Sequence, residues 1–453
     1  MKLNFDVFKS YDIRGLVEDV SPRLAFLLGK AGADYFSAGI IVVGRDMRPE
    51  SQELASSIIE GLVVRGRQVV DLGLVTTDML NFSIAKFGYS GGFMVTASHN
   101  PGVYSGIKVS GGLRNGCITS LGLGTGLEVL RDKIINQEFN PTSDQSGKVE
   151  NKEVLDIWID HCLGVVGNLS KIKLGYDSGN GMAGIFVDQL KQKTKLEIDA
   201  IYQELDGSFP NHPAYPMLPQ NMRDLAVLVQ DKKLDLGVGF DGDGDRAFFV
   251  DNYGDFIDGN LTAIVLVLAL RDQYPDKKLK LVHGIRISRN VLDLAKRLGI
   301  ETIISKAGYL SIREAMISHQ ADLGVESSGH YYFADNYMID SGLLTTLKVI
   351  KYLEDKKLTL AEIRRRFVSY DSSGEVNLEV EAKDQVMEAL AGKYSDKKLS
   401  FLDGVSIDSG DWWANIRASN TEPYLRINLE SKSQELTSQV LTELVNFIEG
   451  QSY

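Results

Sequence analysis

Phe93-Met94-Val95-Thr96-Ala97-Ser98-His99-Asn100-Pro101 is a short apolar run that passes into a polar turn. The apolar residues 93–95 indicate a buried strand. Because Pro101 disfavours a helical conformation at Asn100, we expect the strand to leave through a loop that presents the hydroxyl of Ser98. A lone hydroxyl is a weak nucleophile and needs a base, a lowered pKa or a metal before it reacts. Chemistry at Ser98 would therefore need such groups from other parts of the chain.

The chain before this turn alternates between strand and helix patterns. Residues 40–43 and 69–73 have the apolar character of buried strands, and residues 51–64 between them place apolar side chains on one helical face. Strand, helix and strand in this order indicate a parallel α/β sheet. The same rhythm returns further along the chain, which predicts several α/β units.

Length and composition limit the class of protein. A chain of 453 residues exceeds a single ordinary core, and we expect roughly three or four domains. With 43% hydrophobic and 24% charged residues, the chain has the composition of an ordinary globular protein. The net charge of −12 argues against a nucleic-acid partner, although a local basic pocket could still bind a small anion.

From the sequence we expect neither an export signal nor a membrane-spanning segment. Residues 1–6 contain no apolar signal segment. The longest apolar run, residues 261–270, is too short to cross a bilayer and indicates a buried helix. Cys117 and Cys162 have no CxxC spacing, so we expect no disulfide framework. These features predict a cytoplasmic protein without a membrane partner.

The most specific motif is Asp241-Gly242-Asp243-Gly244-Asp245-Arg246, which follows an apolar strand pattern at 234–240. Three carboxylates at alternate positions can converge on one hard divalent cation, and without a cation they repel one another. A calcium-binding EF-hand is a poor match, because it needs Gly and Glu at the positions held by Arg246 and Asn252. The loop therefore predicts a Mg²⁺ site that holds a phosphate oxygen, with a solvated acidic turn as the alternative.

Basic side chains elsewhere could serve the same site. Arg14 precedes Gly15 in a loop, where its planar guanidinium can clamp an anion; a surface arginine at a turn is the alternative. Lys108 could return to the Ser98 loop as a phosphate ligand or acid/base group, or be solvated. His99 adjoins Ser98, and because neighbouring side chains usually point apart, we do not expect it to be a simple general base for that serine.

The second half of the chain contains two further polar loops. A strand pattern at 321–325 leads into Glu326-Ser327-Ser328-Gly329-His330, whose carboxylate and hydroxyls suit the hydroxyls of a sugar and whose histidine can shuttle protons. Arg417-Ala418-Ser419-Asn420-Thr421 combines a guanidinium, two hydroxyls and an amide, which suits a phosphate. Residues 343–367 are expected to be helical, and residues 369–374 to be an interdomain linker.

Taken together, these loops resemble the α-D-phosphohexomutase superfamily, in particular its bacterial phosphomannomutase/phosphoglucomutase branch. The resemblance covers nearly the whole chain and rests on five motifs in family order: Tyr11–Gly15, Thr96–Pro101, Gly239–Arg246, Glu326–His330 and Arg417–Pro423.

This resemblance implies an α/β fold with four domains around a central active-site cleft. The first three domains are expected to be similar α/β units with mixed sheets, and the fourth a smaller α+β domain. The expected domains are residues 1–147, which contain the phosphoserine loop, and residues 148–251, which contain the metal loop. They are followed by residues 252–368, which contain the sugar-binding loop, and residues 369–453, which contain the phosphate-binding loop.

The resemblance also implies roles for individual residues. Ser98 is expected to be the phosphorylated serine and to hold Mg²⁺ together with Asp241, Asp243 and Asp245. Further catalytic positions are expected at Arg14, His99, Lys108, Arg246 and His330. Substrate contacts are expected from Tyr11, Arg286, Lys306, Glu326, Ser328, Arg417, Ser419, Asn420, Thr421 and Arg426.

The reaction implied is the interconversion of hexose 6-phosphate and hexose 1-phosphate, of mannose, glucose or both. Phosphoserine would give its phosphoryl group to the sugar, and the resulting hexose 1,6-bisphosphate would reverse its orientation in the cleft and return its other phosphoryl group to Ser98. The same bisphosphate would serve as the phosphorylating activator. The partners are then hexose phosphates, and the oligomeric state, monomer or dimer, stays open. Alternatives are a phosphoglucosamine mutase, an enzyme that uses an aspartyl phosphate on Asp241, and a non-catalytic sugar-phosphate-binding protein.

The sequence departs from the family pattern at three positions near these loops, and one of them is Ser327, which occupies a variable position between Glu326 and Ser328. Tyr309 stands where the family often has His, which leaves open any acid/base or phosphate contact there. Ser105 stands where Asn is usual. The amide of Asn420 favours the mannose and glucose phosphate branch, because amino-sugar mutases tend to carry Gly at that position.

Overall fold

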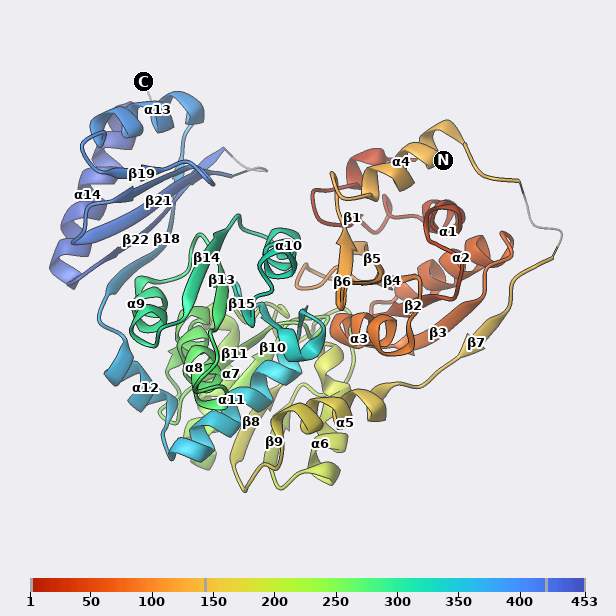
Figure 1. Ribbon diagram of the computed structural model, residues 1–453, viewed down its shortest axis with the longest axis horizontal. Coiled ribbons are helices and arrows are strands. Elements are labelled where there is room, and N and C mark those ends of the chain that lie inside the picture. The colour runs from red at the N-terminus through yellow and green to blue at the C-terminus, as the bar shows by residue number, and fades with distance from the viewer. Residues whose placement is uncertain (1–2, 142–144, 420–422, 452–453) are drawn as a thin grey trace.

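The computed structural model describes residues 3–141, 145–419 and 423–451. Within them four β-sheets follow one another along the chain, and each is the centre of one domain (Figure 1). We number the domains I to IV by their sheets. The first three sheets mix parallel and antiparallel strands and the fourth is antiparallel, which confirms the predicted fold class.

Domain I contains the largest sheet, with seven strands in the order β1-β5-β4-β2-β3-β7 and with β6 paired to β5. Its core strands β4, β2 and β3 are parallel, as the strand–helix–strand pattern predicts, and the long strand β5 returns antiparallel to β4. The strands are β1 (Ile13–Leu16), β2 (Ile41–Arg45), β3 (Val69–Leu74), β4 (Gly91–Val95), β5 (Tyr104–Arg114), β6 (Cys117–Leu121) and β7 (Val149–Asn151). The helices are α1 (Pro22–Tyr35), α2 (Ser51–Val63), α3 (Thr77–Phe87) and α4 (Leu127–Asn136).

Domain II has a five-stranded sheet in the order β12-β11-β10-β8-β9. Strands β8, β9 and β10 are parallel, and β11 and β12 turn back antiparallel. The strands are β8 (Lys173–Asp177), β9 (Glu197–Ile201), β10 (Leu236–Phe240), β11 (Ala247–Val250) and β12 (Phe256–Ile257). The helices are α5 (Leu155–Val166), α6 (Val187–Lys193) and α7 (Arg223–Lys232).

Domain III repeats this plan with the order β14-β13-β15-β16-β17. The predicted helical region 343–367 is two helices, because the chain turns at Lys357 and restarts at the capping residue Thr359. The strands are β13 (Lys280–Gly284), β14 (Glu301–Ser305), β15 (Leu323–Val325), β16 (Tyr331–Phe333) and β17 (Ile339–Asp340). The helices are α8 (Gly259–Gln273), α9 (Arg289–Arg297), α10 (Tyr309–His319), α11 (Gly342–Lys356) and α12 (Leu360–Phe367).

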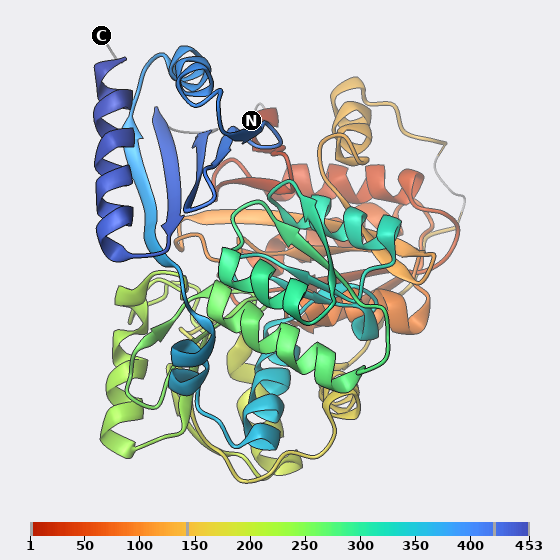
Figure 2. The same cartoon turned by 60° about the vertical axis from the view of Figure 1, so that its left-hand side comes forward.

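Domain IV has the antiparallel order β18-β22-β21-β20-β19, and α14 lies along one face of this sheet (Figure 2). The strands are β18 (Asp371–Glu379), β19 (Lys398–Ser400), β20 (Val405–Asp408), β21 (Trp412–Ala418) and β22 (Tyr424–Ser431), and the helices are α13 (Lys383–Lys393) and α14 (Gln434–Gly450). The prediction of a linker at 369–374 is wrong for most of its length. Residues from Asp371 onward open β18, where Asp371 pairs with Ser431 of β22, because backbone pairing overrides the polar composition of this segment.

The packing ties three domains together and leaves the fourth separate. One buried cluster runs from Val42 in β2 through Trp158 in α5 to Ile350 in α11, so domains I to III share apolar contacts. Domain IV has a cluster of its own, centred on β21, β22 and α14. The apolar run 261–270 lies inside α8 and is largely buried, as predicted. Among the described residues, no helix is both long and apolar enough to span a membrane.

Candidate active site

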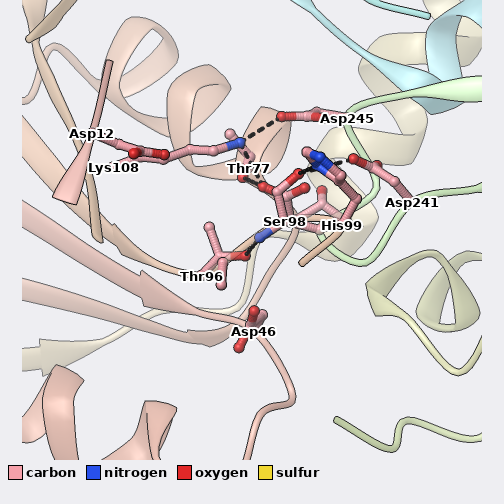
Figure 3. Close-up of polar contacts among 12 residues, drawn as sticks. Asp12, Asp46, Thr77, Thr96, Ser98, His99, Lys108, Asp241 and Asp245 are labelled. Carbon is pink, nitrogen blue, oxygen red and sulfur yellow. Dashed lines mark hydrogen bonds and ion pairs between the residues drawn. The ribbon is translucent and has the colours of Figure 1, made fainter. Parts of the chain in front are cut away.

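The Ser98 loop leaves β4 at Val95 and holds its serine in a strained conformation. Ser98 has a φ of +49°, in the left-handed region that residues other than glycine seldom adopt. Its backbone N–H donates to Thr96 Oγ1 at 2.9 Å. The residue is only 3% exposed, and its side chain points toward the aspartate loop of domain II (Figure 3). Such strain persists only where the surroundings enforce it.

Arg48 enforces the shape of this loop. Its buried guanidinium donates to four backbone carbonyls, those of Ser98 (3.0 Å), Asn100 (2.6 Å), Pro101 (2.9 Å) and Tyr104 (3.0 Å). Its Nε donates to Asp46 Oδ2 at 3.2 Å, and Asp46 also accepts from Ser51 Oγ at 2.5 Å. One arginine thereby satisfies most of the polar backbone of the turn, which a buried loop requires.

The aspartate loop connects β10 to β11 and touches the Ser98 loop directly. Oxygens of Asp241, Asp243 and Asp245 lie within 4.8 Å of one another, and all three side chains are buried. A Cβ at Gly242 would lie 2.4 Å from the carbonyl oxygen of Ser98, so only glycine permits this close approach. Ser98 Oγ donates to Asp241 Oδ2 at 3.1 Å. The structure thus joins two loops that lie 143 positions apart in the sequence.

Lys108 places a positive charge between two of these carboxylates. It lies on β5 opposite Met94 of β4, and its Nζ donates to Asp243 Oδ2 at 2.6 Å. The same Nζ donates to Asp245 Oδ2 at 2.7 Å (Figure 3). Burial alone would lower the pKa of Lys108, but the two carboxylates raise it above its ordinary value. Burial alone would raise the pKa of Asp243, but the ammonium of Lys108 lowers it. Burial and the charges of Asp245 and Asp243 raise the pKa of Asp241 to about 8.

The carboxylate cluster fits a divalent cation. Among the described residues, Asp243 Oδ1 and Asp245 Oδ1 are buried and have no hydrogen-bond partner. Unpaired buried carboxylate oxygens are costly, and a cation is one way to remove that cost. Together with Asp241 and the hydroxyl of Ser98 they make an all-oxygen donor set, which is the set that Mg²⁺ prefers.

His99 lies beside the Ser98 hydroxyl, and the expectation that the two side chains point apart is wrong. His99 Nδ1 lies 3.2 Å from Ser98 Oγ, because the left-handed turn at Ser98 breaks the alternation expected of an extended chain. The ring stacks on Tyr215 with 4.6 Å between centroids, and Nδ1 also contacts Arg246. Burial, then Arg246 and Arg14, lower the pKa of His99 well below its ordinary value. The imidazole is therefore neutral, and its nearer nitrogen is already engaged by a guanidinium.

Two arginines from different domains complete the surroundings of Ser98. Arg246 donates to Ser98 Oγ at 3.2 Å and lies 3.0 Å from Asp241 Oδ2. Arg14 donates to the carbonyl of Ala97 at 2.7 Å. Together with Lys108, these arginines bring positive charge around the serine loop from β1, β5 and the aspartate loop, which is what an anionic group there would need.

His330 approaches the same cluster from domain III. Its Nδ1 lies 2.8 Å from Asp340 Oδ2, and Asp340 Oδ1 accepts from Arg313 Nη2 at 2.9 Å. Because the Asp340 carboxylate accepts a hydrogen bond from Nδ1 of His330, the proton stays on Nδ1, and Nε2 is left to act as an acceptor. Burial alone would lower the pKa of His330, but Asp245 and Asp340 raise it. The arrangement suits a residue that exchanges a proton with a bound hydroxyl.

The loop that begins at Glu326 is preorganised. Glu326 is buried, with Oε1 accepting from Tyr332 Oη at 2.9 Å and Oε2 from Ser328 Oγ at 3.4 Å. A carboxylate and a hydroxyl held side by side can accept from and donate to neighbouring sugar hydroxyls.

Three arginines gather where domains III and IV meet. Arg417 of β21 and Arg426 of β22 are direct partners across the antiparallel ladder, and Arg286 follows β13 of domain III. All three guanidiniums contact the carboxylate of Glu375 on β18. A guanidinium cluster of this kind suits a phosphate group.

Most of these groups line one cavity of about 540 Å³. The predicted site residues that line it are Tyr11, Arg14, Ser98, His99, Lys108, Asp245, Arg246, Arg286, Glu326, Ser328, His330, Arg417 and Arg426. Asp241 and Asp243 lie buried behind Ser98 and Lys108, which they contact. Tyr309 Oη donates to the carbonyl of Tyr11 at 2.5 Å, and this contact between two cavity-lining residues joins domain III to domain I.

Some predicted contacts are not brought to this cavity. Lys306 is exposed after β14 and lies outside the lining. Ser419 is buried behind Arg426, whose Nη2 donates to its Oγ at 3.4 Å. Asn420 and Thr421 lie outside the described residues.

Several residues of the site could not be found by motif. Arg48, Thr77, Asp340 and Glu375 act through contacts with residues far away in the sequence, such as the 2.5 Å hydrogen bond from Thr77 Oγ1 to Asp243. The only local signal was for Arg48, which follows the end of a strand together with an aspartate, in the sequence Gly44-Arg45-Asp46-Met47-Arg48.

Comparison with family models matches every domain of the chain. The matches are phosphoglucomutase/phosphomannomutase alpha/beta/alpha domain I at residues 6–117, domain II at 156–254, domain III at 258–370 and the C-terminal domain at 375–447. Together they span most of the sequence in unbroken family order.

Individual relatives agree in length as well as sequence. A phosphomannomutase of Escherichia coli K12 is 33% identical over 455 residues, covering 97% of this chain and 98% of that protein. A phosphomannomutase of Vibrio cholerae is 34% identical, covering 97% and 98%. A solved phosphoglucomutase/phosphomannomutase family protein of Burkholderia thailandensis superposes with a TM-score of 0.89 at 24% identity, covering 100% of this chain and 99% of that one.

Proposed function

Since the chain belongs to the phosphoglucomutase/phosphomannomutase family, whose members are phosphohexose mutases, we propose that it interconverts hexose 6-phosphate and hexose 1-phosphate through a phosphate carried on Ser98. The observation that carries this proposal is the convergence at one hydroxyl. Ser98 Oγ lies 3.1 Å from Asp241 Oδ2 and 3.2 Å from Arg246 Nη2. It lines a cavity whose wall also includes the loop that begins at Glu326 and the arginine cluster at domains III and IV.

Asp241, Asp243, Asp245 and Ser98 would hold Mg²⁺. When bound, the ion would neutralise phosphate charge and help to orient the phosphate oxygens. The unpartnered oxygens of Asp243 and Asp245 support this assignment.

The remaining cations would act on the transferring phosphoryl group. Phosphoryl transfer makes little demand on covalent chemistry and depends on in-line positioning and stabilisation of charge. Arg246 contacts the serine oxygen, Lys108 sits between two carboxylates, and Arg14 is tied to the serine loop. In these positions the three cationic side chains would stabilise the phosphoryl group both on Ser98 and on the sugar oxygen that receives it.

The opposite end of the cavity would hold the sugar and its second phosphate. Glu326 and Ser328 would contact the sugar hydroxyls, and Arg286, Arg417 and Arg426 would bind the phosphate that does not react. His330 would accept the proton of the attacking sugar hydroxyl at Nε2 and return it in the reverse step, with Asp340 keeping the other ring nitrogen protonated. Binding a sugar with phosphate at either end requires contacts that tolerate both orientations, and one hydroxyl-binding loop beside one phosphate clamp meets this need.

Labelling by a radiolabelled hexose 1,6-bisphosphate tests the proposal. We expect acid-stable label in the peptide that contains Ser98. Hydroxylamine-labile label on Asp241 would instead identify an aspartyl phosphate, and binding of hexose 1-phosphate without turnover would identify a non-catalytic protein. A coupled assay that compares mannose 1-phosphate with glucose 1-phosphate then assigns the sugar.

A further inference from the structure

Glu375 places a carboxylate in the middle of the arginine cluster. Its Oε2 lies 3.0 Å from Arg417 Nη2 and 3.4 Å from Arg286 Nη1, and its Oε1 lies 3.5 Å from Arg426 Nη1. The contacts join β18, β21 and β22 of domain IV to the loop after β13 of domain III. Glu375, like the three arginines, lines the cavity.

The cluster has an electrostatic reason to hold an anion. Burial, then the neighbouring charge of Arg286, lower the pKa of Arg417, whereas Glu375 opposes that shift. Gathering three guanidiniums therefore costs free energy that a carboxylate reduces. A phosphate would meet the same donors with more charge and with three terminal oxygens. A carboxylate and a phosphate cannot occupy these donors fully at the same time.

We propose that Glu375 is an internal counter-ion that competes with the substrate phosphate for Arg286, Arg417 and Arg426, and thereby limits how tightly the clamp holds it. This inference rests on the proposed function, because it assigns the arginine cluster to the non-reacting phosphate. The carboxylate offsets part of the positive charge of the three guanidiniums when no phosphate is bound, and it swings aside when one arrives.

The competition has a use in the proposed reaction. The bisphosphate must leave the clamp and reverse its orientation before the second transfer, so a clamp that binds too strongly would slow turnover. An anion on a neighbouring strand can replace the departing phosphate at the same guanidiniums, which lowers the free-energy cost of releasing that phosphate. Glu375 is placed to do this, because its strand pairs with β22, which carries Arg426.

The first test measures phosphate affinity without catalysis. Inorganic phosphate is titrated by calorimetry into the wild-type protein and into Glu375→Gln, which keeps the shape of the side chain and removes its charge. We expect the Kd for phosphate to fall by at least about tenfold, since removing a like charge a few ångströms away is worth that much at the dielectric of a cleft. Glu379→Gln is the matched control, because Glu379 is exposed further along β18; its Kd should change by less than about twofold.

A double substitution locates the effect. In an Arg417→Ala background the gain from Glu375→Gln should shrink, because one of the donors for which the two anions compete is gone. An undiminished gain would place the phosphate elsewhere in the cavity and would overturn the inference. So would weaker phosphate binding by Glu375→Gln, since Glu375 would then position the arginines for phosphate and not compete with it.

Steady-state kinetics give the second readout. Glu375→Gln should lower KM and kcat together, because the clamp both binds more tightly and releases more slowly. A higher KM with unchanged kcat would contradict competition. If the wild-type protein shows no mutase turnover, the proposed function fails, whereas the phosphate titration still decides the role of Glu375.

Discussion

Replacing Arg48 by lysine should release the Ser98 loop from its strained shape. Arg48 makes four hydrogen bonds to loop carbonyls and one to Asp46, all from one planar group. An ammonium has three donors on a single atom and cannot reach carbonyls on both sides of the guanidinium plane. At least two of these five hydrogen bonds would therefore be lost.

The magnitude follows from those lost contacts. A buried polar group left without a hydrogen bond costs about 1–3 kcal/mol, so the loss of two should lower the free energy of unfolding of Arg48→Lys by about 2–6 kcal/mol. The strain at Ser98, of order 1–3 kcal/mol for a residue in this conformation, would then relax by moving the hydroxyl. Misplacing a reacting group by about 1 Å can cost about 10²-fold in rate, so we expect kcat to fall by at least that factor.

Urea unfolding and a coupled mutase assay measure the two effects. Arg131→Lys is the control, because Arg131 lies on the surface of α4 and pairs with the adjacent Asp132; it should change stability by less than about 0.5 kcal/mol. Labelling of the folded Arg48→Lys protein by bisphosphate separates loop placement from unfolding. Wild-type stability together with wild-type turnover in this variant would refute the role given to Arg48.

Three other predictions address the chemistry and the interface between domains. Ser98→Ala removes the proposed phosphate carrier and should lower turnover by at least about 10⁴, or roughly 5 kcal/mol of barrier, in a primed coupled assay; near-normal turnover would contradict the assignment. Arg417→Ala should raise KM more than it lowers kcat, because the phosphate it binds takes no part in the transfer, and an unchanged KM would argue against the clamp. Burial, with smaller contributions from the nearby carboxylates, raises the pKa of Asp78 from 3.8 to about 7 while Ser341 donates to it across the domain I–III interface. The folded state therefore holds this proton where the unfolded state has lost it, and stability should fall as pH rises between these values. Asp78→Asn should flatten that fall, by up to about 4 kcal/mol at pH 8, in urea midpoints measured from pH 4 to 8, and an unchanged pH profile would count against it.

The separate core of domain IV bears on how the proposed phosphate clamp, formed by Arg286, Arg417 and Arg426, would work. Domains I to III share one apolar cluster, whereas domain IV packs its own and meets domain III through charged contacts such as Arg286 with Glu375. Polar contacts of this kind are easier to exchange than a packed apolar interface. If the proposed phosphate binds across this boundary, it would contribute directly to how domain IV is held.

The sequence by itself determined the α/β class and the loops that carry chemistry. Apolar periodicity depends on neighbours a few positions apart, so β4, β10 and the buried helix α8 could be predicted from local pattern. The alternating aspartates of the loop after β10 likewise predict a cation site from a stretch of only six residues. The predicted domain boundaries at residues 147, 251 and 368 stay predictions. In the structure, β7 extends the sheet of domain I past residue 147, and β12 extends the sheet of domain II past residue 251.

Only the tertiary structure decided which groups meet. The polar segment after residue 369 became a strand because β22 was available to pair with it, and His99 came to lie beside Ser98 because a distant arginine enforces a left-handed turn there. Glu375 entered the site by the docking of one domain on another. Such contacts depend on the positions of whole sheets, whereas sequence patterns record only what lies within a turn or two of the same strand or helix.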